Sequence, residues 1–157
     1  MTASTHLAVG AAVGLTVHHG CLSVDAGNPE RLFWAFAAGF VSHLVLDAFP
    51  HQEYALEGTK LGVVLLVEIV VIFGILLSPS SSLLTNAIIF FGMVGGAVPD
   101  TMNLVYRNIV SWPWIESVGL KIHFCHGAIP IGFAVDFYLQ ALVALIAVIL
   151  VRFRLAL

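Results

Sequence analysis

The strongest constraint on this chain is a polar stripe inside an apolar run, the stretch Ser42-His43-Leu44-Val45-Leu46-Asp47-Ala48-Phe49-Pro50-His51. His43, Asp47 and His51 recur at intervals of four, so on an α-helix they lie above one another on one face. Two imidazoles and a carboxylate are costly in apolar surroundings unless each has a partner, and a metal ion is a partner that suits all three. The stretch therefore predicts a helix whose polar face contributes to a metal site.

The rest of the chain is apolar enough to predict a membrane protein. Of its 157 residues, 60% are hydrophobic and 10% are charged, and the mean hydropathy is +1.03. A soluble domain carries about 25% charged residues. The net charge is −3 and no basic run is present, so nucleic acid is not an expected partner. Cys21 and Cys125 are the only cysteines and lie in different contexts, so a disulfide framework is not expected.

Five apolar segments predict the fold class. We expect an all-α integral membrane protein, a single domain over residues 1–157, built as a bundle of about five transmembrane helices with an interfacial segment before the last one. A helix needs about 20 apolar residues to span a bilayer. Tryptophans and charges among apolar residues place the interfacial segment at 105–127. The expected spans are Ala3–Val17, Arg31–His51, Leu61–Leu77, Leu83–Leu104 and Ala128–Val151.

Antiparallel spans in this order would bring candidate ligands from distant segments to one face of the membrane. The N-terminus, the 51–60 connection and the 105–127 connection would share that face. Histidine and carboxylate ligands with little thiolate suit Zn²⁺, and Mn²⁺ or Fe²⁺ stay open. The expected metal ligands are His6, His43, Asp47, Asp100, His123 and His126, with Cys125 as a weak candidate and His51 as a further ligand or a catalytic acid/base.

Each of these polar residues also has a structural interpretation. A single histidine can be an ordinary interfacial residue, and Asp100 after Pro99 can be a carboxylate that ends a helix near lipid headgroups. Glu68 and Asp136, two further carboxylates in apolar segments, are expected to pair with groups on other helices or to support the site.

A metal site of this composition favours hydrolysis. A bound metal ion turns water into a nucleophile near neutral pH and polarises a phosphoryl or carbonyl oxygen. The chain has no Gly-x-Ser-x-Gly, Walker or His-Glu-x-x-His motif, so serine hydrolases, P-loop proteins and zincins have no support. The sequence thus favours a metal-dependent membrane hydrolase acting on a lipid or lipid-linked substrate, for example a phosphoester, at the membrane interface. The alternatives are a non-catalytic metal or proton carrier, a structural membrane protein, and a bis-histidine haem protein.

Four short motifs carry a resemblance to a known family. They are Thr5-His6-Leu7, Ser42-His43-x-x-Leu46-Asp47-x-x-Pro50-His51, Val98-Pro99-Asp100 and His123-x-x-His126-Gly127. Together they resemble the motifs of inner-membrane, metal-dependent hydrolases, which implies a metal-dependent hydrolytic activity and a place in the inner (cytoplasmic) membrane of a prokaryote.

The chain departs from that family pattern at three points. Met102 and Asn103 stand where the family has a second aspartate and a histidine. The Ser-His element comes second rather than last, and the two histidines of the pair His123/His126 are closer together than is usual.

Overall fold

The computed structural model describes residues 3–22, 26–48, 58–76, 82–108 and 132–155, and these ranges are all-helical. The helices are α1 (Ala3–Gly20), α2 (Asn28–Asp47), α3 (Gly58–Leu76), α4 (Leu83–Asn108) and α6 (Phe133–Leu155).

Helix α2 has boundaries that follow from its sequence. Gly27 precedes it in an extended conformation (φ −67°, ψ 157°), and Pro29 lies in the first turn, where a missing N–H removes no helical hydrogen bond. The helix ends at Asp47, three residues before Pro50, because a proline disfavours helical geometry in the residue that precedes it. Asp47 therefore lies in the last turn of α2.

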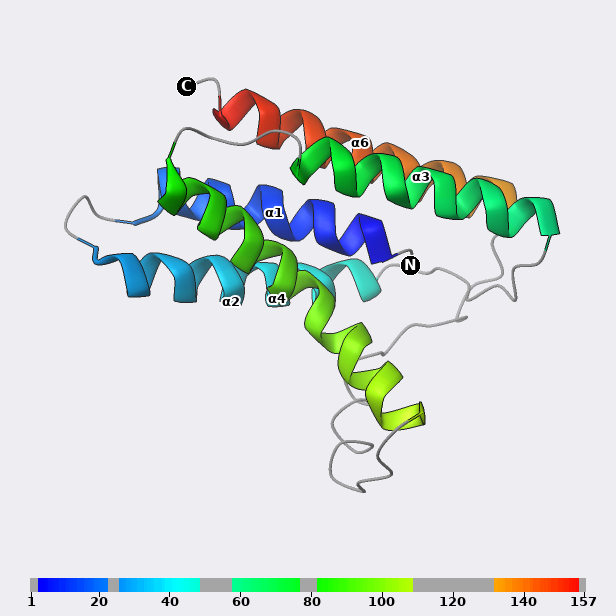
Figure 1. Cartoon of the computed structure of the whole chain (residues 1–157), viewed down its shortest axis with the longest axis horizontal. Coiled ribbons are helices and arrows are strands. Elements are labelled where there is room, and N and C mark those ends of the chain that lie inside the picture. Colours follow the sequence, from blue (N-terminus) through cyan, green and yellow to red (C-terminus); the bar gives the residue numbers. More distant parts are fainter. Residues whose placement is uncertain (1–2, 23–25, 49–57, 77–81, 109–131, 156–157) are drawn as a thin grey trace.

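Helix α1 is the centre of the molecule and packs against each of the other four helices. In Figure 1 it runs between α3 and α6 on one side and α2 and α4 on the other. Its buried apolar side chains are small apart from one leucine, so neighbouring helices can approach on several sides. These residues are Ala8, Ala11, Ala12 and Leu15.

Helices α1, α2 and α4 meet with their backbones in contact. A Cβ atom added to Gly10 of α1 or to Gly39 of α2 would overlap the carbonyl oxygen of Gly92 in α4. Only glycine leaves room for such an approach, because it has no side chain. Small residues allow helices to pack closely in this way. This close crossing determines how near the polar ends of α1 and α2 come to α4.

The prediction of five transmembrane helices is wrong. Within the described residues, only α4 and α6 contain stretches long and apolar enough to cross a membrane, Leu83–Met102 and Ala134–Phe153, with mean hydropathies of 1.4 and 2.4. Helix α2 contains three charged residues, and the apolar stretch of α3, Gly62–Ile75, is shorter than the roughly 20 residues that a span requires. Two such helices are weak support for membrane association and do not indicate which membrane.

Helix α4 also continues further than expected. It passes through Pro99 and ends at Asn108, so residues 105–108 belong to this helix and not to a separate interfacial segment. The rest of the predicted interfacial segment, with Cys125, lies outside the described residues.

Candidate metal centre

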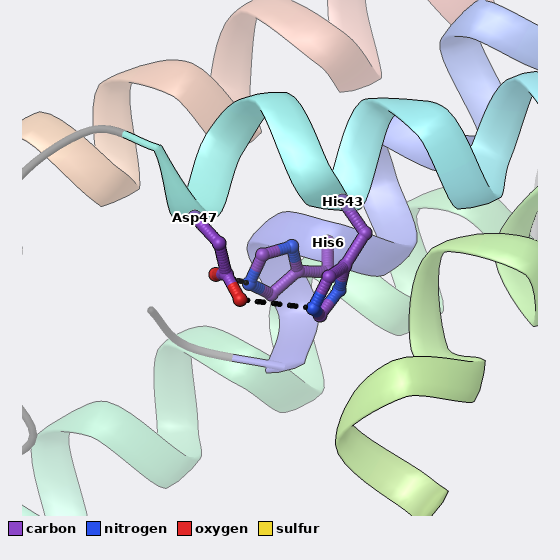
Figure 2. Close-up of side chains that lie close together, drawn as sticks. All are labelled: His6, His43 and Asp47. Carbon is purple, nitrogen blue, oxygen red and sulfur yellow. Dashed lines mark ion pairs between the residues drawn. The ribbon is translucent and has the colours of Figure 1, made fainter. Parts of the chain in front are cut away.

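Three side chains meet at the end of the bundle where α1 begins and α2 ends. Figure 2 shows His6 from α1 facing His43 and Asp47 from α2. Asp47 Oδ1 lies 3.4 Å from His6 Nε2, and Asp47 Oδ2 lies 3.1 Å from His43 Nε2. All three side chains are almost completely buried. Two imidazoles and a carboxylate thus share one small volume that the rest of the protein encloses.

Local sequence and helix packing each supply part of this arrangement. His43 and Asp47 are four residues apart on α2, so they lie on one face of it. Helix α1 runs antiparallel to α2 (Figure 1), which places His6, in the first turns of α1, beside the last turn of α2. The two imidazole rings stack with centroids 4.0 Å apart and an interplanar angle of 29°.

The backbone of α4 orients His43. Nδ1 of His43 lies 2.8 Å from the carbonyl oxygen of Gly96. Because a carbonyl oxygen can only accept, Nδ1 carries the proton and donates it, and Nε2 is the nitrogen that points towards Asp47. Histidines that bind metals commonly donate their second ring N–H in this way, which selects the tautomer and the ring orientation.

His6 lacks a comparable hydrogen bond within the described part of the chain. Neither of its ring nitrogens has a hydrogen-bond partner there, although the side chain is 1% exposed and Nε2 faces Asp47. A buried polar group without a hydrogen bond costs about 1–3 kcal/mol. A cation bound to a His6 nitrogen would remove that cost.

The separations fit a metal ion. One ligand atom from each of His6, His43 and Asp47 can be chosen so that all lie within 4.8 Å of one another. Zinc–ligand bonds of about 2.0–2.1 Å in a tetrahedron place neighbouring ligand atoms roughly 3.3 Å apart. The distances of 3.1 and 3.4 Å from the Asp47 oxygens to the two imidazoles are close to that value. The three residues could therefore hold a metal ion.

Asp100 lies at the edge of this group. Its Oδ1 is 3.8 Å from His43 Nε2, and its side chain is 37% exposed, in contrast to the buried triad. Asp100 follows Gly96 by one turn of α4, so the same face of α4 meets both ring nitrogens of His43. The structure thus brings together four of the residues that the sequence nominated, while His51, His123 and His126 lie outside the described residues.

The carboxylates Glu68 and Asp136 lie on the other side of α1. Asp136 is buried and accepts a hydrogen bond of 2.9 Å from Gln140 Nε2 one turn further along α6. Thr5, next to His6, donates to the backbone carbonyl of Gln140 at 3.4 Å. Glu68 lines a small cavity between α1, α3 and α6 together with Thr5 and Gln140. The hydrogen bond between Thr5 and Gln140 connects the first turns of α1 to α6.

Sequence reasoning missed Gly96 and Gln140 as parts of the surroundings of the site. Gly96 acts through a backbone carbonyl, for which no residue type is diagnostic, and the only signal was the run of small residues that contains it. Gln140 lies one helical turn after Asp136, and this spacing could have suggested the pair.

No family model, no curated protein and no solved structure matches the chain. The resemblance to inner-membrane hydrolases therefore stays a prediction.

Proposed function

We propose that this protein is a metal-dependent hydrolase that acts on a lipid or lipid-linked phosphoester at a membrane interface. The observation that carries the proposal is the buried group of His6, His43 and Asp47, whose potential ligand atoms lie within 4.8 Å of one another. Three protein ligands with a further position for water are typical of catalytic zinc sites, whereas structural zinc sites have four. Zn²⁺ is the proposed ion, and two histidines with one carboxylate would also suit Fe²⁺.

The residues around this group support hydrolytic chemistry. A divalent ion held there would make a bound water acidic enough to act as a nucleophile and would polarise the phosphoryl oxygen. Asp100 is close to His43 and partly exposed, so it can contact both the site and an incoming substrate. It is the described residue best placed to accept a proton from the attacking water.

The proposed setting is a membrane, with α4 and α6 as the membrane-spanning helices. Only 28% of the apolar stretch of α6, Ala134–Phe153, is buried inside the protein, whereas a core helix of a soluble protein would be mostly buried. Large apolar side chains along its length, such as Leu142, Leu145 and Ile149, are about half exposed. Lipid chains would cover this surface, and the resemblance favours the inner membrane of a prokaryote.

Hydrolysis is tested with purified protein in detergent micelles that contain a phospholipid and a lipid phosphate monoester. After addition of Zn²⁺, we expect ³¹P NMR to show release of a headgroup phosphate or of inorganic phosphate. The release should stop with EDTA and in His43→Ala, and should persist in His19→Ala, which removes an exposed histidine from the other end of α1. A zinc-loaded protein that releases neither product would contradict the proposal.

A second candidate function is metal or proton transfer across the membrane. It is favoured by the buried polar groups on the far side of α1, where Thr5 and Asp136 continue from the metal centre towards α6. Proteoliposomes loaded with a zinc-sensitive dye distinguish the two functions. Zinc uptake without phosphate release would favour transfer, and release without uptake would favour hydrolysis.

A further inference from the structure

We infer that Gly96 is a positioning residue that sets the place of both histidines of the metal centre and makes Nε2 of His43 the metal-binding nitrogen. The inference rests on the proposed metal centre and assigns a role in it to a glycine, which acts through its backbone and its small size. Two independent contacts of Gly96 carry it.

The first contact is made by the carbonyl group of Gly96. Its oxygen accepts the Nδ1–H of His43 at 2.8 Å, and His43 is completely buried. The ring can rotate only by giving up this hydrogen bond in a place that water does not reach. Nε2 is therefore left to face Asp47, 3.1 Å away, where the proposed ion would bind.

The second contact is made possible by the missing side chain. A Cβ atom at Gly96 would overlap the carbonyl oxygen of His6 and would lie 3.1 Å from its carbonyl carbon. The backbone of His6 thus rests directly on Gly96, and a methyl group there would push the first turns of α1 away. One residue of α4 therefore sets the position of His6 by its small size and that of His43 by its carbonyl group.

Gly92 provides a matched control one turn earlier on the same helix. A Cβ atom there would overlap the carbonyl oxygen of Gly10 and would also lie 3.1 Å from the carbonyl carbon. Gly92→Ala and Gly96→Ala thus insert the same methyl group against the same kind of atom between the same two helices. If Gly96 contributed only to helix packing, the two substitutions would change Co²⁺ binding equally.

The first test titrates Co²⁺ into the metal-free full-length protein and its two variants in detergent, with the visible absorption of bound Co²⁺ as the readout. Thermal unfolding of the same samples measures the loss of packing. We expect both variants to lower the unfolding midpoint similarly. Gly96→Ala keeps the backbone carbonyl but displaces the backbone of His6, so it should weaken Co²⁺ binding by about 10–100-fold more than Gly92→Ala, with an altered spectrum. Equal Co²⁺ affinities and spectra in the two variants would overturn the inference.

The second test needs no variant and remains informative should Gly96→Ala fail to fold. In zinc-loaded protein with ¹⁵N-labelled histidine, the ring nitrogen shifts should show zinc on Nε2 of His43 and a proton on Nδ1. Zinc on Nδ1 would overturn the inference while leaving the metal centre intact. Wild-type protein that binds neither Co²⁺ nor Zn²⁺ would overturn the metal centre and this inference with it.

Discussion

His43 is the residue whose surroundings say most about the site. Its Nδ1 donates to the carbonyl of Gly96, while its Nε2 faces Asp47 and, at 3.8 Å, Asp100. The i, i+4 spacing of His43 and Asp47 was readable from the sequence because it depends only on helix geometry. The hydrogen bond to Gly96 was not, because any residue of α4 could have supplied a carbonyl oxygen at that position.

His18 marks the opposite end of α1 and gives a prediction about pH. Nη1 of Arg31 lies 3.0 Å from Nδ1 of His18, and because a guanidinium can only donate, the imidazole accepts in its neutral form. Partial burial, with the positive charges of His19 and Arg31, lowers the pKa of His18 below its usual 6.5. The unfolded chain then takes up a proton at His18 more readily than the folded protein does.

The sign of the pH effect follows from this difference. Well above pH 6.5 His18 is neutral in both states and its hydrogen bond with Arg31 is intact. As the pH falls through 6.5, the folded state loses stability until His18 is protonated in it as well. In His18→Gln this contribution is absent, so the variant should lose less stability than wild type between about pH 7.5 and pH 5. Thermal unfolding midpoints of both proteins across that range check the prediction, and identical slopes would contradict it.

At the scale of helices, the site depends on how closely α1, α2 and α4 cross. Helices α1 and α4 are rich in small residues, and the structure has backbone contacts at Gly10, Gly39 and Gly92. The meeting of His6 with His43 and Asp47 was expected from antiparallel neighbours. That expectation was drawn from five antiparallel membrane spans, and this number of spans is wrong. Helices α1 and α2 nevertheless run in opposite directions, which is sufficient to bring the start of α1 beside the end of α2.

Gly10 should be sensitive to the addition of one methyl group. In Gly10→Ala the new Cβ would overlap the backbone of Gly92, so helices α1 and α4 must separate, at a cost of about 1–3 kcal/mol for an overfilled contact. Gly62 of α3 is the control, because a Cβ there meets no atom of the described residues within 4 Å and alanine is the better helix former by about 1 kcal/mol. In a denaturing detergent, the free energy of unfolding of Gly62→Ala should equal or exceed that of wild type, and that of Gly10→Ala should be lower. A Gly10→Ala protein as stable as wild type would contradict a backbone contact between Gly10 of α1 and Gly92 of α4.

At the scale of the whole molecule, apolar composition indicated a membrane protein but did not give the number of spans. Polar residues that serve the site interrupt the apolar pattern of α1 and α2, since His6, His43 and Asp47 lie in those two helices. Only α4 and α6 keep a stretch of sufficient length and hydropathy. Counting apolar segments treated every long run as a span and gave too little weight to these polar positions.

Helix α6 gives the prediction about membrane association. With about half of the Leu145 surface exposed on a helix of spanning length, the protein should stay in the membrane pellet after alkaline carbonate extraction. Leu145→Arg places a charge on this surface and should release a large fraction of the protein, because a charge at the centre of a membrane helix costs about 2.5–3.5 kcal/mol on insertion scales. Leu145→Phe keeps the surface apolar and should stay in the pellet. Recovery of wild-type protein in the supernatant would rule out α6 as a membrane-spanning helix.

The metal content of the purified protein tests the central claim most directly. Elemental analysis of wild type should find bound divalent metal, with zinc as the expected element, and His19→Ala should retain the same amount because His19 is exposed at the far end of α1. The double variant His43→Ala/Asp47→Ala removes two of the three buried groups and should contain almost none. Equal metal content in wild type and the double variant, at zero or at any other level, would contradict a metal centre at His6, His43 and Asp47.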